Sequence, residues 1–120
     1  MDKKTNIQEI KEKIKHFIGE RDWEQFHHPK ELAISISLEA AELLELFQWK
    51  EKQSLEDLRN DKKLMQKLKE ELADIMIYAI DVANYTGIDV SDAIIEKLKK
   101  NAEKYPIEKA KGSNKKYNEL

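Results

Sequence analysis

The sequence predicts an all-α fold with four main helices. Apolar residues recur at the three- and four-residue spacing of a helix, and no stretch alternates apolar and polar residues as a strand does. Only three glycines and two prolines occur among 120 residues, so few positions can interrupt a helix. Hydrophobic residues make up 40% and charged residues 38%, which is typical of one folded domain and excludes a disordered chain.

The first helix is expected to begin after Thr5, a possible N-cap. Four isoleucines then share one helical face: Ile7, Ile10, Ile14 and Ile18. Residues 20–30 are rich in aromatic and histidine side chains and are predicted to form a loop. Pro29 suits the first turn of a helix, so a second helix is expected from about residue 30 to residue 50.

The long helix of the fold is predicted over residues 61–86. It follows a short helical turn, which Ser54 and Asp57 open with the spacing of a capping box. Gly87 is well placed to end the long helix, because glycine adopts the left-handed conformation of a C-cap without strain.

The last helix is expected to be capped by Asp89 or Ser91 and to end before Pro106. We therefore place the domain over residues 1–106. Residues 107–120 form a basic C-terminal tail with four lysines, expected to be loosely ordered in isolation.

Composition excludes several classes of protein. Acids number 24 and bases 22, giving a formal net charge of −2, so bulk charge does not indicate a nucleic-acid partner. The absence of cysteine excludes disulfides, zinc–thiolate sites and a cysteine nucleophile. No stretch is long and apolar enough to span a membrane, and the first residues contain no apolar run. We expect a cytoplasmic protein without a membrane partner.

Carboxylates occupy an otherwise apolar helix over residues 30–50. Apolar side chains cover nearly its whole circumference, which is typical of a helix buried in a bundle or in a subunit interface. Glu39 and Glu42 nevertheless lie three residues apart on one narrow stripe, and Glu45 lies about a sixth of a turn further round.

The long helix repeats this arrangement. Five polar residues follow one face at spacings of three, four, three and four: Glu71, Asp74, Tyr78, Asp81 and Tyr85. Glu70 points away from that face. Asp81 and Tyr85 extend the stripe without an assigned role, and a hydrogen-bonded structural role is expected for them.

A buried cluster of like charges needs a compensating charge, since each acid otherwise takes up a proton. Terminal lysines could fold back onto the cluster, or a divalent cation could bind. No histidine stands at the spacing of a di-iron motif, and all-oxygen ligands favour Mg²⁺ or Mn²⁺. The alternative is that these acids are the solvated face of ordinary amphipathic helices.

At these acids the sequence resembles the MazG-like all-α nucleotide pyrophosphohydrolases. The family pattern appears as Glu39-Ala-Ala-Glu42 and Glu71-Leu-Ala-Asp74. A likeness to the dCTP pyrophosphatase branch rests on four further segments: Arg21–His27, Glu45–Lys50, Glu70–Tyr78 and Lys104–Pro106.

The resemblance implies a chemistry. A nucleoside triphosphate, dCTP or a modified dCTP, would be cut to the monophosphate and pyrophosphate, which sanitises the nucleotide pool. It also implies a Mg²⁺ site and a homodimer or homotetramer whose active sites use residues of neighbouring subunits. The expected catalytic and metal-binding residues are the four acids: Glu39, Glu42, Glu71 and Asp74. One of them, or Glu45 or Glu70, would orient the attacking water as general base.

Aromatic and histidine side chains are candidates for holding the base: Trp23, Phe26, His27 or His28, Trp49 and Tyr78. Tyr78 lies one turn from Asp74 on the acidic stripe, and the resemblance places Trp23, His27 and Trp49 near the base. The alternative for the two tryptophans is ordinary core or interface packing.

Lys97, Asn101 and Lys104 share a face of the last helix. The resemblance implies that this face and the tail approach the triphosphate, with Lys97 and Asn101 as the expected pair. The alternative is a solvated basic helix end that suits the helix dipole.

Two other functions stay open at this point. The same reaction could act on dUTP or another non-canonical nucleotide. The chain could instead be a non-catalytic helical interaction module whose acids pair with a basic partner. In either case, two helices that are apolar all round need more cover than 120 residues supply, which favours a homo-oligomer.

Overall fold

The computed structural model describes all 120 residues and contains helices but no strand. The elements in chain order are α1 (Ile7–Glu20), the 3₁₀ turn η1 (Glu24–Phe26), α2 (Pro29–Glu45), α3 (Leu55–Asn60), α4 (Lys62–Thr86), α5 (Val90–Lys104), α6 (Ile107–Ala110) and the 3₁₀ turn η2 (Tyr117–Glu119). The all-α prediction is confirmed, and the four predicted helices are the four longest. The chain falls into two compact units, Met1–Gly87 and Ile88–Leu120.

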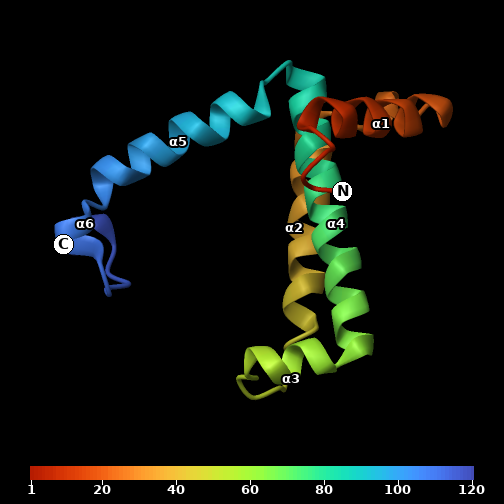
Figure 1. Cartoon of the computed structure of the whole chain (residues 1–120). Coiled ribbons are helices and arrows are strands. Elements are labelled where there is room, and N and C mark those ends of the chain that lie inside the picture. The colour runs from red at the N-terminus through yellow and green to blue at the C-terminus, as the bar shows by residue number, and fades with distance from the viewer. The chain divides into compact units, whose positions relative to one another are not determined.

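An antiparallel pair of helices, α2 and α4, forms the frame of the first unit (Figure 1). The short helix α3 joins them at one end, and α1 packs against α4 at the other. The antiparallel register brings His27, just before α2, to Asp81 on α4, and lets Glu39 interact with Glu71. Polar stripes far apart in the sequence therefore face each other.

Side-chain caps define where the helices begin. The N-cap of α1 is Asn6, whose side chain accepts a hydrogen bond from the backbone N–H of Glu9, so the expectation of Thr5 was wrong by one residue. Ser54 accepts from the backbone N–H of Asp57, as its spacing predicted. Asp61 caps α4 in the same manner.

The second helix is shorter than predicted. It ends at Glu45 rather than near residue 50, because the following backbone N–H groups bond three residues back instead of four. This tighter turn ends at Trp49, whose φ of 66° lies in the left-handed region. The segment after Glu45 is therefore a turn that presents its side chains outside the helix.

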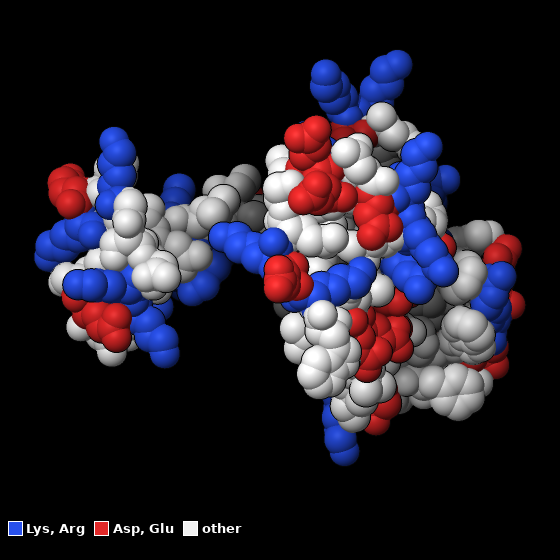
Figure 2. Space-filling view, turned by 90° about the horizontal axis from the view of Figure 1, so that it is seen from below, with Lys and Arg blue, Asp and Glu red and all other residues white.

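The core of the first unit is small. The buried apolar side chains Ile14, Ile18, Leu32 and Ala83 lie toward the end where α1 packs against α4, and Leu64 is buried at the start of α4, near α3. Asn84 on α4 donates a hydrogen bond from Nδ2 to the backbone carbonyl of Lys11 on α1, at 3.0 Å. On the face drawn in Figure 2, acidic and basic side chains are interspersed, as the net charge of −2 leads one to expect.

The second unit contains α5, α6 and η2. Asp89 caps α5, which settles the choice between Asp89 and Ser91. The tail is more structured than predicted, because Tyr117 packs edge-on against Tyr105 with 6.4 Å between ring centroids and receives Lys104 over its ring at 5.0 Å. The predicted domain boundary at residue 106 lies inside this unit and stays a prediction. No helix has both the length and the apolar character needed to cross a bilayer.

The substitution Gly87→Ala should destabilise the protein by about 1–2 kcal/mol, because Gly87 ends α4 with φ of 76°, where a Cβ is strained. No atom lies within 4 Å of the added Cβ, so backbone strain alone is tested. Thermal unfolding measures the change. Gly19→Ala, inside helix α1, is the matched control and should be neutral or stabilising, because the added Cβ meets only the flexible end of Glu24, 3.2 Å away, which can shift. Equal melting temperatures for wild type and Gly87→Ala would contradict the prediction.

Candidate metal centre

Three carboxylates meet between α2 and α4. Glu39 and Glu42 project from α2 and Glu71 from α4, and one oxygen from each lies within 4.8 Å of the others. Glu39 and Glu71 are partly buried, whereas Glu42 is exposed. The structure thus brings together three of the four acids that the sequence predicted to act together.

The cluster lacks a compensating group. Glu39 Oε2 and Glu71 Oε2 are buried and have no hydrogen-bond partner. The ion pairs within the first unit include His16–Glu20, Arg21–Glu20 and His27–Asp81, and none of these three involves one of the four acids. The predicted alternative, in which lysines of the C-terminal tail fold back onto the acids, stays a prediction, because the tail belongs to the second unit.

Like charges in this cluster perturb each other's protonation. Burial, hydrogen bonding to Glu71 and Glu42, and the charges of Glu42 and Asp74 together raise the pKa of Glu39 to about 7. The hydrogen bond from Glu39 lowers the pKa of Glu71, but burial together with Glu42 and Asp74 leaves that pKa raised. Burial and the neighbouring acids therefore oppose the charged form of both Glu39 and Glu71.

The donor set fits a hard divalent cation. All three converging groups are carboxylate oxygens, two of them unpaired and buried, and no softer ligand is present. Asp74 lies outside the 4.8 Å group, yet its charge raises the pKa of both Glu39 and Glu71. The fourth predicted acid therefore adds negative charge beside the group.

A second cluster consists of Trp23, His27 and Tyr78. The ring centroids of Trp23 and His27 are 6.1 Å apart, and those of His27 and Tyr78 are 6.3 Å apart. Burial raises the pKa of Tyr78, and the charges of Glu39 and Asp74 raise it further. Tyr78 is thus the link between this ring cluster and the acids.

The remaining aromatic candidates stand apart from this cluster. Trp49 is 94% exposed and contacts no other ring. A bulky side chain at φ of 66° is uncommon and strained, so the turn after α2 holds Trp49 out at a cost. Phe26 is also exposed and makes no ring contact.

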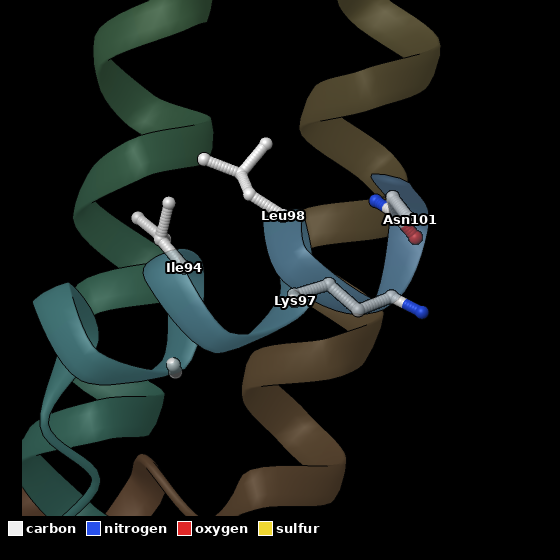
Figure 3. Close-up of a pocket in the computed structure, with 5 residues that line it drawn as sticks. Ile94, Lys97, Leu98 and Asn101 are labelled. Atoms are coloured by element: carbon white, nitrogen blue, oxygen red, sulfur yellow. The ribbon is translucent and has the colours of Figure 1, made fainter. Parts of the chain in front are cut away.

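The second unit holds the two predicted phosphate ligands. Lys97 and Asn101 line a surface pocket of about 340 Å³ on α5 with three apolar residues: Ala93, Ile94 and Leu98. In Figure 3, Lys97 and Asn101 extend toward the right of the view, and Ile94 and Leu98 project upward beside them. The two residues share a face, as their spacing predicted.

The two alternative general bases lie outside the acid cluster. Glu70 is exposed and accepts a hydrogen bond from Gln66 Nε2 at 3.2 Å. Glu45 lines a different pocket with neighbours that include Lys50, Lys63 and Lys67. Neither belongs to the group of converging carboxylates.

Sequence reasoning assigned no role to Asp81 and Tyr85. In the structure, Asp81 Oδ2 lies 2.7 Å from His27 Nδ1, and the hydroxyl of Tyr85 lies 3.0 Å from His28 Nδ1. The expected hydrogen-bonded roles are thus confirmed. Their position one and two turns beyond Tyr78 on the same face indicated that these two residues belong to the polar stripe. It did not indicate that their partners are histidines.

Comparison with known proteins identifies the family of this chain. The sequence profile of the MazG-like family matches residues 34–120. The chain belongs to the MazG-like family. It is 37% identical over 114 residues to dCTP pyrophosphatase 1 of Mus musculus, covering 95% of this chain and 67% of that protein, and 36% identical to dCTP pyrophosphatase 1 of Homo sapiens over the same shares.

A solved structure agrees with this assignment to the MazG-like family. It is a pyrophosphatase from Archaeoglobus fulgidus that superposes with a TM-score of 0.74 at 37% identity, covering 83% of this chain and 92% of that one. The resemblance inferred from the acidic motifs is confirmed. The prediction of an enzyme of the nucleoside triphosphate pyrophosphohydrolase type is also confirmed. It replaces the alternative of a non-catalytic helical interaction module.

Without metal, the protein should lose stability as the pH rises from about 4.5 to 7. The pKa of Glu39 is higher in the folded chain than its ordinary value of 4.5, so folding binds a proton in this window and that stabilisation fades as the proton leaves. Thermal melts in a chelator across this range measure the effect. Glu39→Gln should flatten the dependence, and Glu9→Gln on exposed α1 should not. An identical pH dependence in Glu39→Gln and wild type would contradict it.

Proposed function

We propose that this MazG-like enzyme hydrolyses dCTP, or a modified dCTP, to the monophosphate and pyrophosphate with the help of Mg²⁺. One observation carries the proposal: carboxylates from two antiparallel helices converge with two buried oxygens unpaired. The names of the relatives support the choice of dCTP. Clearing such nucleotides from the pool, in the cytoplasm, is the role that we infer.

The acids have two tasks in this proposal. Glu39, Glu42 and Glu71 would hold the cation, and Asp74 would add the fourth negative charge. A bound divalent ion supplies charge neutralisation at the phosphates and lowers the pKa of water. One of the four carboxylates then accepts a proton from the attacking water at the α-phosphorus, and pyrophosphate leaves.

The ring cluster is the proposed site for the base. Trp23 and His27 offer faces for stacking, and Tyr78 joins them to the acids. Trp49 offers a further face, exposed on its strained turn. Lys97 and Asn101 on α5 are the proposed ligands of the phosphates.

A homodimer or homotetramer is part of the proposal. Large apolar side chains are exposed along both helices of the acid cluster: Ile34, Leu38, Leu44, Leu72, Met76 and Ile77. An accumulation of exposed apolar side chains on two packed helices suits a subunit interface. The exposed Trp49 would then find its contacts in a neighbouring subunit.

Pyrophosphate release with Mg²⁺ and a panel of nucleoside triphosphates tests the activity. We expect dCTP or its modified forms to have the highest kcat/KM, with dUTP as the competing candidate. Glu71→Gln should lower kcat by roughly 100-fold or more, since it removes a carboxylate from the converging group. Chelation of the metal should do the same.

Glu12→Gln is the matched control for that prediction, because Glu12 is exposed on α1 and accepts a hydrogen bond from Gln8. It should keep the wild-type rate. Equal losses in the two variants, or full activity in Glu71→Gln with its helix content unchanged, would contradict the site.

Leu38→Glu should disrupt the oligomer, because Leu38 is 60% exposed on the apolar side of α2 and a charge there cannot be buried between subunits. Sedimentation should give the wild type two or four times the chain mass of 14.1 kDa and the variant a smaller assembly. Lys13→Glu on exposed α1 is the control. A monomeric wild type would refute the oligomer.

A further inference from the structure

The contact between His27 and Asp81 is not explained by packing alone. Asp81 is only 7% exposed, and its Oδ2 lies 2.7 Å from Nδ1 of the partly buried His27. His27 binds the carboxylate of Asp81, whose backbone lies within α4. A buried carboxylate needs a hydrogen-bond donor, and here His27 is the group that can supply it.

This contact fixes which nitrogen of the imidazole carries the hydrogen. A carboxylate accepts hydrogen bonds and donates none, so the hydrogen between the two groups belongs to His27 Nδ1. In a neutral imidazole, Nε2 then carries no hydrogen and offers a lone pair. Asp81 therefore determines that the free edge of His27 is an acceptor.

We expect a base to approach His27 from the side away from Asp81. On the Asp81 side, the pocket between α1, η1 and α4 measures about 90 Å³ and is lined by opposite charges, Lys15 and Glu24 among them. That volume holds a few waters and is too small for a nucleobase. The other surroundings of the His27 ring are Trp23 and Tyr78, the proposed base site.

The loop that carries His27 is held in place from a rigid helix. Asp81 binds His27, and Tyr85, one turn further along α4, binds His28 through its hydroxyl at 3.0 Å. Two adjacent residues of the loop are thus tied to one face of a 25-residue helix. The orientation of the imidazole is fixed before substrate arrives, which is what a selective contact requires.

We propose that Asp81 is a positioning residue that makes His27 select the amino group of cytosine over the carbonyl of uracil. Cytosine presents an N4 amino donor where uracil presents an O4 acceptor. An acceptor at Nε2 forms a hydrogen bond with the first and opposes the second. The inference rests on the proposed function, because it assumes that a base lies beside His27.

The test compares Asp81→Asn with wild type in dCTP and dUTP hydrolysis. The amide of Asn can donate to Nδ1, which permits the tautomer with hydrogen on Nε2 and removes the selection. The ratio of kcat/KM for dCTP over dUTP should fall by about tenfold or more, the value of one hydrogen bond to the base. In a His27→Ala background, the Asp81 substitution should have no further effect on this ratio.

Tyr85→Phe is the matched control. It removes a histidine tether from the same face of α4 but leaves His27 Nδ1 bonded to Asp81. Its dCTP to dUTP ratio should equal that of wild type. A loss of selectivity in Tyr85→Phe as large as in Asp81→Asn would refute the inference, since loosening of the loop would then be the cause.

Nitrogen NMR of the histidine ring gives a readout independent of activity. His27 in the wild type should carry its hydrogen on Nδ1, and Asp81→Asn should shift the population toward Nε2. Hydrogen on Nε2 in the wild type would overturn the inference even if the Asn variant did not fold. An unchanged ratio in a folded Asp81→Asn would overturn it and leave the pyrophosphohydrolase proposal standing. A wild type that releases no pyrophosphate from any nucleotide would overturn both.

Discussion

The repulsion between carboxylates held together by α2 and α4 is the constraint around which the first unit is organised. Glu39, Glu42 and Glu71 converge within 4.8 Å, and two of their oxygens are buried without a partner. Such a cluster opposes folding unless protons or a cation neutralise it. Repulsion between these acids lowers the free energy of unfolding. Binding of a cation to the folded chain would raise it again.

One face of α4 makes two different sets of contacts along its length. Toward its start, Glu71 and Asp74 face the acids of α2, and toward its end, Asp81 and Tyr85 bind the histidines that precede α2. Tyr78 lies between these groups, and charges from both sides raise its pKa. Each turn of an α-helix advances about 5.4 Å. The distance along α4 between the acid cluster and the ring cluster is therefore similar to the distance between the phosphates and the base of a nucleotide.

Several features of the site could be read from the chain before any coordinates. Helical geometry alone places Glu39 and Glu42 on one stripe of their helix, and Glu71 and Asp74 on one stripe of theirs. The end of α2 could not be read in this way, because apolar periodicity continues past Glu45 while the backbone tightens toward the positive φ of Trp49. The partners of Asp81 and Tyr85 were equally hidden, since they lie 54 and 57 residues away in the sequence.

The sequence by itself determined the helices, most of their ends and the family, because capping, periodicity and short acidic motifs are local properties of the chain. Only the tertiary structure decided that two carboxylate oxygens are buried and unpaired, that Trp49 stands exposed, and that Asp81 is bonded to His27. The physical reason is that pairing, burial and tautomer depend on which side chains meet across helices. The register between α2 and α4 sets those meetings, and no periodicity within one helix contains it.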